Sequence, residues 1–137
     1  MSVNQRRVAM ITGGNSGIGF AVASKLAAQG FHVILASRNQ QTSARAMARI
    51  HAGNPNASVE SLPLDLASFA AVRQCAAAFQ AQGYPLHVLI NNAGGSIAGK
   101  QASFTTDGFE LTLGTNHLGH FLLTNLLLDN LKRSAPA

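Results

Sequence analysis

Short apolar runs alternate with longer helical patterns along this chain of 137 residues. Continuous apolar stretches of this length are typical of strands that are buried on both faces of a sheet. The predicted strands are 8–11, 32–36, 58–64 and 88–90. Helices are predicted over 16–29, over 41–51, from Ser68 onward and from 105–107 to about Lys132. Helical crossovers between consecutive strands require parallel strands, so we expect a doubly wound α/β sheet that ends after its fourth strand–helix unit.

Several local features refine these elements. Ile18, Val22 and Leu26 recur every four residues and predict the first helix. Asp107, with Glu110 three residues later, resembles a capping box and predicts the start of the last helix. Pro63 lacks a backbone N–H, so we expect it at the end of its strand or at a sheet edge.

The charge balance invites a nucleic-acid interpretation, since the net charge is +5. The ten Lys and Arg residues are scattered, however, and no aromatic residues alternate with them to stack bases. We therefore expect no nucleic-acid binding. A modest positive field suits a small ligand that carries phosphate equally well.

The cysteine and the apolar segments bear on compartment. Cys75 is the only cysteine, so we expect a small buried side chain in a reducing compartment. The most apolar segment, 118–131, is too short to span a bilayer and contains polar residues. We expect no membrane span and a cytoplasmic location. His117 and His120 have no third ligand nearby, so no metal site is predicted.

A glycine-rich segment, Thr12-Gly13-Gly14-Asn15-Ser16-Gly17-Ile18-Gly19, joins the first strand to the first helix. A pyrophosphate at such a turn meets free backbone N–H groups and the positive end of the helix dipole. Gly13 permits the tight turn, Gly17 lets backbone approach the phosphates, and Gly19 lets helix and strand pack closely. The spacing is not G-x-x-x-x-G-K-[ST], which disfavours ATP or GTP hydrolysis.

With this T-G-x-x-x-G-x-G spacing and Asn91-Asn92-Ala93-Gly94 after the fourth strand, the chain resembles the short-chain dehydrogenase/reductase family. Residues 105–132 look most like the retinol dehydrogenase and light-dependent protochlorophyllide reductase groups. The resemblance implies that residues 1–137 form a single, partial NAD(P)-binding domain of the Rossmann type, truncated after the fourth strand–helix unit. The cofactor-binding residues it implies are Gly13, Asn15, Ser16, Gly17, Ile18, Gly19, Arg38, Asn39, Asp65, Leu66, Asn92, Ala93, Gly94 and Thr115.

The segment after the second strand, Ser37-Arg38-Asn39, holds no carboxylate. In the family this position selects the cofactor, and an acidic residue there would accept hydrogen bonds from the ribose of NAD. Arg38 instead offers a planar fork to a 2′-phosphate, which favours NADP(H) over NAD(H). The alternative is a solvated arginine at the end of a strand.

Asn116 resembles the asparagine of the family's catalytic tetrad, whereas the rest of the tetrad has no counterpart. The only tyrosine is Tyr84, and Val88 rather than lysine follows it by four residues. Two readings remain open. Either a longer form acts on a small-molecule substrate, or the chain is an inactive nucleotide-binding or interaction module. In both cases we expect self-association, because residues 118–131 carry more Leu and Phe than one helix face needs.

Overall fold

The computed structural model describes residues 1–96 and 101–136. Within them, four strands form one sheet: β1 (Val8–Thr12), β2 (His32–Ser37), β3 (Ser58–Pro63) and β4 (Val88–Ile90). The strand order is β3-β2-β1-β4, and each neighbouring pair is parallel. The predicted parallel sheet is confirmed.

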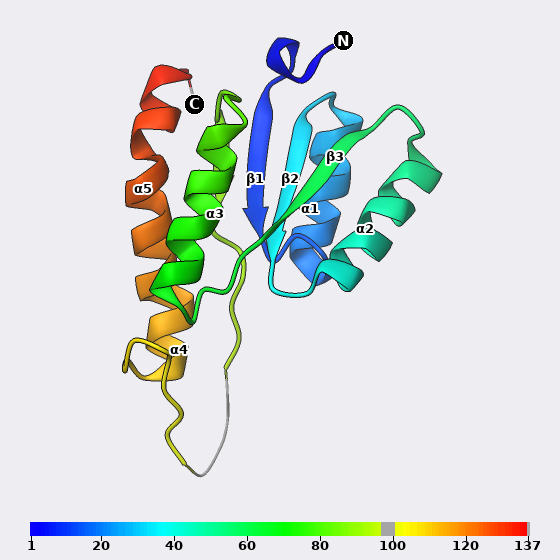
Figure 1. The fold of residues 1–137 in the computed structure, drawn as a ribbon. Coiled ribbons are helices and arrows are strands. Elements are labelled where there is room, and N and C mark those ends of the chain that lie inside the picture. The colour runs from blue at the N-terminus through cyan, green and yellow to red at the C-terminus, as the bar shows by residue number, and fades with distance from the viewer. Residues whose placement is uncertain (97–100, 137) are drawn as a thin grey trace.

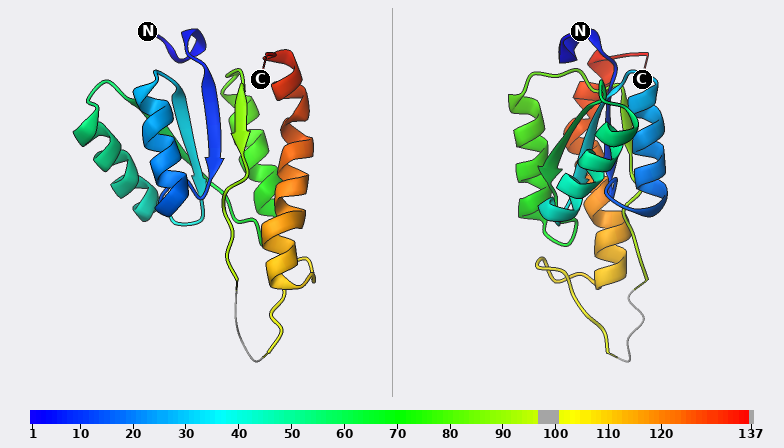
Figure 2. Two further views of the ribbon diagram at one scale, coloured as in Figure 1. Left: turned by 180° about the vertical axis from the view of Figure 1, so that it is seen from behind. Right: turned by 90° about the vertical axis from the view of Figure 1, so that its right-hand side faces the viewer.

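Helices cover both faces of this sheet (Figure 1). The long ones are α1 (Gly17–Ala28), α2 (Gln40–Gly53), α3 (Phe69–Ala81) and α5 (Gly119–Arg133). A single turn α4 (Leu111–Leu113) and a π-helical turn η2 (Gly114–Leu118) lead into α5, and a short 3₁₀ turn η1 (Val3–Gln5) precedes β1. Helices α1 and α2 lie on one face and α3 and α5 on the other, as Figure 1 and the left view of Figure 2 show.

The side chains on the two faces of β1 and β2 belong to two separate cores, because successive side chains of a strand point to opposite sides. Met10 and Ile34 belong to the cluster under α3 and α5. Ile11 and Leu35 belong to the cluster under α1 and α2. Both strands are therefore buried on both sides, which explains why each appears as an unbroken apolar run in the sequence.

The chain changes direction across the sheet after β3. Strands β1, β2 and β3 add in one direction, and the chain then returns to place β4 on the far side of β1. In open α/β sheets, the loops separate at such a switch point and leave a crevice at the carboxyl ends of the strands. That crevice lies between the loops that follow β1 and β4.

The helix predicted from the spacing of Ile18, Val22 and Leu26 is confirmed as α1, but its fully buried residues are others. Gly19, Ala23 and Ala27 are the buried residues, whereas the Ile18 side chain is 78% exposed. Small side chains let the helix lie close to the sheet, and Val22 and Leu26 pack, partly buried, against the same core.

The predicted start of the last helix is wrong. Glu110 is the N-cap of α4, and its carboxylate accepts from the N–H groups of Thr112 and Leu113. Asp107 instead accepts a hydrogen bond from the Phe69 N–H at 2.8 Å and so satisfies the first turn of α3. Gly108, at φ +86°, turns the chain between the two acidic residues.

Other local predictions are confirmed. The Ser68 hydroxyl accepts from the Ala71 N–H and caps α3, and Pro63 is the last residue of the edge strand β3. Cys75 is buried, and burial raises the pKa of its thiol to about 11. Among the described residues, no helix is both long enough and apolar enough to cross a bilayer.

Candidate functional site

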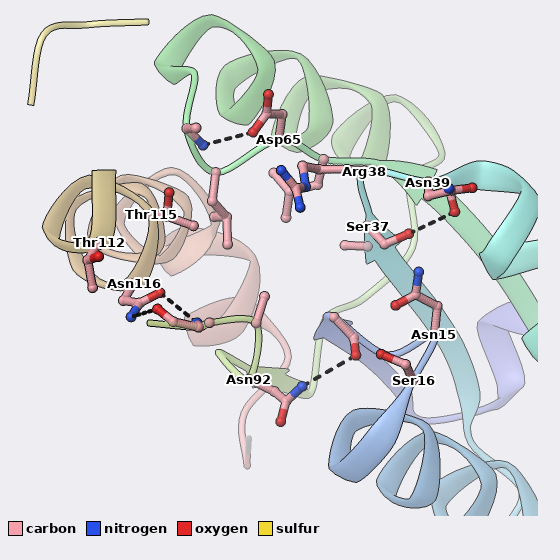
Figure 3. Close-up of a pocket in the computed structure, with 18 of the residues that line it drawn as sticks. Asn15, Ser16, Ser37, Arg38, Asn39, Asp65, Asn92, Thr112, Thr115 and Asn116 are labelled. Atoms are coloured by element: carbon pink, nitrogen blue, oxygen red, sulfur yellow. Dashed lines mark hydrogen bonds between the residues drawn. The ribbon is translucent and has the colours of Figure 1, made fainter. Parts of the chain in front are cut away.

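A cavity of about 570 Å³ opens at the carboxyl ends of the four strands. Its volume is in the range of small-molecule and cofactor sites. Every strand contributes to its wall through the loop that follows it, and the turn from α4 to η2 closes one side (Figure 3). The lining residues are Gly13, Asn15, Ser16, Ile18, Ala36, Ser37, Arg38, Asn39, Leu64, Asp65, Leu66, Ala67, Asn92, Ala93, Gly94, Gly95, Leu111, Thr112, Thr115 and Asn116.

The first turn of α1 lies at this cavity with unsatisfied donors. The Phe20 N–H is the first to bond within the turn, to the Ser16 carbonyl. The Ser16 side chain makes no capping bond, and the N–H groups of Gly17, Ile18 and Gly19 have no acceptor among the described residues. Three adjacent donors at the positive end of a helix dipole form an anion-binding geometry.

The glycine loop admits no larger side chain where it meets the segment after β4. A Cβ on Gly19 would overlap the Gly13 carbonyl oxygen and lie 2.5 Å from the Asn92 amide nitrogen. A Cβ on Gly13 would lie 3.0 Å from the Ala93 Cα. Gly17 has φ +54° and open space around it. Gly13 thus makes the turn with a φ of +65°, as predicted, whereas Gly19 packs against the glycine loop and Asn92 rather than against the strand.

The segment after β2 presents Arg38 and Asn39 at the cavity wall, and both are exposed. The Asn39 side-chain oxygen accepts from the Thr42 N–H at 3.0 Å and caps α2. Below them, the buried hydroxyls of Ser37 and Ser43 lie 2.6 Å apart. This contact ties the end of β2 to α2 and holds the segment that carries Arg38.

Asp65 and Leu66 line the cavity from the loop after β3. One Asp65 carboxylate oxygen accepts from the Ala67 N–H at 2.9 Å, so this residue also shapes its own loop. Leu66 is buried and lies close to Gly119, where a Cβ would come within 2.5 Å of the Leu66 carbonyl oxygen. Gly119 therefore lets α5 pass against the cavity wall.

The Asn92 side chain joins the loops after β1 and β4. Its amide donates to the Thr12 carbonyl at 3.1 Å and to the Gly13 carbonyl at 3.4 Å. The Thr12 hydroxyl in turn accepts from the backbone N–H groups of Asn92 and Ala93, both at 2.9 Å. These bonds fix the strand ends on either side of the crevice.

Thr115 and Asn116 lie in the π-helical turn η2. The Asn116 amide donates to the Gly95 carbonyl at 2.9 Å, and its side-chain oxygen accepts from the Gly95 N–H at 3.2 Å. Asn116 thus binds the backbone after β4 in the way a neighbouring strand would. A Cβ on Gly94 would lie 3.2 Å from the same side-chain oxygen.

Of the residues predicted for the site, all except Gly17 and Gly19 line the cavity. Those two lie in the loop and the first turn of α1, where their backbone conformation matters rather than their surface. The lining residues that sequence reasoning missed are Ala36, Ser37, Leu64, Ala67, Gly95, Leu111 and Thr112. Thr112 lies one helical turn before Thr115 and Asn116, and this spacing could have indicated it.

The two histidines near the site differ in their surroundings. His117 is exposed, and His120 is buried and hydrogen-bonded to the protein, so neither is placed as a metal ligand. Within residues 1–96 and 101–136, no group of three or more His, Cys, Asp or Glu side chains could hold a metal ion.

A doubly wound parallel sheet with a cavity and a free helix N-terminus at its switch point defines the nucleotide-binding class of α/β proteins. The sequence profile of the short chain dehydrogenases matches residues 7–136. The chain belongs to the short-chain dehydrogenase/reductase family of oxidoreductases, as its motifs predicted.

Known proteins show the same relationship. The WW domain-containing oxidoreductase of Danio rerio is 50% identical over 131 residues, which are 96% of this chain and 31% of the relative. The chloroplastic protochlorophyllide reductase of Chlamydomonas reinhardtii is 46% identical over 135 residues, or 97% of this chain and 34% of the relative. The chain thus spans about a third of the length of these two relatives.

Among solved structures, the NADP complex of RhlG from Pseudomonas aeruginosa superimposes with a TM-score of 0.79 and 31% identity. The match covers 98% of this chain and 53% of that chain. The Rossmann-type architecture is therefore shared with this structure, and the predicted fold is confirmed.

Proposed function

We propose that residues 1–137 form the NADP(H)-binding part of an oxidoreductase. The bound nicotinamide would supply hydride exchange with a carbonyl, alcohol or alkene substrate in a longer form of the protein. The observation that carries the proposal is the first turn of α1, whose N–H groups lie unsatisfied beside the cavity.

The other helices that begin at this end of the sheet differ from α1, because side chains cap their first turns. In α2, Asn39 satisfies the Thr42 N–H, and in α3, Ser68 satisfies the Ala71 N–H. The first turn of α1 has no such cap among the described residues. Free N–H groups at the positive end of a helix dipole form an anion-binding site, which supports a pyrophosphate as their partner. The glycine loop leaves room for that group, because no atom lies within 4 Å of a Cβ built on Gly17.

The choice of NADP(H) over NAD(H) rests on the segment after β2. In this proposal the Arg38 guanidinium binds the 2′-phosphate in two parallel hydrogen bonds. The Asn39 amide nitrogen remains free to donate beside it, because its side-chain oxygen is engaged with Thr42. RhlG, which shares this fold, was solved as an NADP complex.

The remaining residues are assigned by the part of the cofactor that they would contact. Asp65 would accept from the adenine amine beside Leu66, and Asn92, Ala93 and Gly94 would lie along the ribose. Thr115 would lie near the cofactor. Asn116, as the tetrad residue, would hold a water for a lysine relay supplied by the longer form.

We further propose that this chain does not turn over substrate on its own. Its only tyrosine, Tyr84, packs edge-on against His32 with the ring centres 5.3 Å apart. Both residues lie where strands begin, at the opposite end of the sheet from the cavity. The second candidate, a nucleotide-binding module without catalysis, is favoured by this placement. NADPH oxidation by the isolated chain with a carbonyl substrate would contradict the proposal of an inactive chain.

Titration of the chain with NADPH and with NADH tests the binding proposal. We expect NADPH to bind at least about tenfold more tightly, and Arg38→Ala to remove most of that difference. Arg45→Ala is the matched control, because Arg45 is an exposed arginine of α2 that does not line the cavity. Equal affinities in the unmodified chain would exclude the NADP(H) assignment, and no binding of either cofactor would exclude the function.

A further inference from the structure

His120 is a buried titratable side chain with no place in the proposed chemistry. It lies in the first turn of α5, and its two ring nitrogens contact different parts of the site. Its Nε2 lies 2.7 Å from the Thr12 hydroxyl oxygen, and its Nδ1 lies 3.0 Å from the Asn116 carbonyl oxygen. The ring thus bridges the end of β1 and the turn η2.

The partners of the ring determine which nitrogen carries the proton. The Asn116 carbonyl can only accept, so Nδ1 must be protonated. The Thr12 hydroxyl oxygen already accepts from the N–H groups of Asn92 and Ala93, which uses both of its lone pairs. Its own hydrogen is therefore free to bond Nε2, which must be bare. The other acceptor in reach is the Ile90 carbonyl at 3.5 Å, a distance at which a hydrogen bond is weak.

One neutral tautomer of His120 therefore gives each of these groups a hydrogen-bond partner: the imidazole, the Thr12 hydroxyl, two backbone N–H groups and one carbonyl. Each protein segment in this set borders the cavity, since Asn92, Ala93 and Asn116 all line it. A second ring proton on Nε2 would give the Thr12 oxygen a third donor and leave its own hydrogen with the distant Ile90 carbonyl.

We propose that His120 is a positioning residue of the cofactor site. As the Nδ1-protonated neutral tautomer, it fixes the Thr12 hydroxyl, which holds the Asn92–Ala93 backbone against the glycine loop, and it fixes the carbonyl of Asn116. This role rests on the proposed binding of NADP(H). The residues of the cavity wall would then be held in place before the cofactor binds, so loss of the His120 bridge would weaken cofactor binding.

Two conservative variants separate the two halves of the bridge. In His120→Asn, an amide nitrogen at the place of Nδ1 can still donate to Asn116 but does not reach Thr12. In His120→Gln, an amide oxygen at the place of Nε2 can still accept from Thr12. We expect NADPH to bind about tenfold more weakly to the Asn variant and within about twofold of the unmodified chain to the Gln variant.

A double-mutant cycle shows whether the effect passes through Thr12. Thr12→Val removes the hydroxyl, so adding His120→Asn to it should weaken NADPH binding little further, since both act on one contact. His117→Asn is the matched control, because His117 is exposed on the same stretch of helix. Unfolding curves recorded beside each titration ensure that affinities are compared between fully folded proteins.

Nitrogen NMR of the histidine rings tests the tautomer without any cofactor. We expect the Nδ1 of His120 to resonate as a protonated nitrogen and its Nε2 as a bare one, with Thr12→Val altering the Nε2 signal. A protonated Nε2, or an Asn variant that binds NADPH as well as the Gln variant, would overturn the proposal. If the unmodified chain bound no cofactor, the proposed function would be excluded, whereas the ring signals would still show whether His120 bridges Thr12 and Asn116.

Discussion

Gly19 shows how a single residue can make cofactor binding depend on packing. Its missing Cβ leaves room for the Gly13 carbonyl and for the Asn92 amide, 2.5 Å from where that Cβ would lie. We expect Gly19→Ala to lower the free energy of unfolding by about 1–3 kcal/mol, as overpacking does, and to abolish NADPH binding. Denaturant unfolding and NADPH titration measure the two effects.

Gly53→Ala provides the comparison for this substitution. Gly53 ends α2, has no neighbour within 4 Å of its added Cβ and has no positive φ. Alanine there should leave binding unchanged and stabilise the chain slightly, because the unfolded state loses freedom. If Gly19→Ala bound NADPH as well as Gly53→Ala, the close contact between glycine loop and Asn92 would not matter for the site.

At this scale the sequence indicated most of the cavity wall, because the glycine and asparagine motifs after the first and fourth strands have the spacing and order of the family. It did not indicate Ser43 or His120. A serine on a helix and a histidine in an apolar stretch look like surface or packing residues until their partners are known. Those partners, Ser37 and Thr12, are 6 and 108 residues away along the chain.

The short turn α4 begins with a carboxylate that should respond to pH. The Leu113 and Thr112 N–H groups bond the Glu110 carboxylate at 2.8 and 2.9 Å and hold its pKa below the ordinary value. The ionised form is thus favoured in the folded state. Its contribution is complete above the ordinary carboxyl pKa and is lost as pH falls through the lowered one.

We therefore expect the Thr112 and Leu113 amide signals to shift in acid together with the Glu110 carboxyl in an NMR titration. In Glu110→Gln, the same amides should show no such transition, because no charge remains to be lost. A Glu110 titration at the ordinary carboxyl pKa would show that the cap does not form in solution.

Elements were predictable where local patterns and tertiary contacts agree. The strands and the first three helices follow from apolar runs, caps and Gly30, whose φ of +87° ends α1. The start of the last helix did not follow. Asp107 and Glu110 match a capping box in spacing, but Asp107 bonds α3 across 38 residues, and no local pattern contains that contact.

For the whole molecule, the alternation of strands and helices predicted a parallel sheet with two covered faces. It did not predict the position of β4 beside β1. That position creates the crevice, because the loops after β1 and β4 separate there. The strand order thus creates the cavity, whereas the local motifs determine which side chains line it.

Self-association remains a prediction, and the outer face of α5 is where it can be tested. Phe121 and Leu128 are seven residues apart on one face of this helix, and their side chains are 62% and 38% exposed. Apolar side chains gathered on one face favour association, because contact removes them from water.

We expect sedimentation equilibrium to show dimers or larger species, and a Phe121→Ser, Leu128→Ser double variant to shift the chain toward monomer. Arg73→Ser, on the exposed side of α3, should leave the distribution unchanged. A stable monomer in the unmodified chain at concentrations of about 100 µM, well above the Kd of a stable dimer, would contradict the prediction.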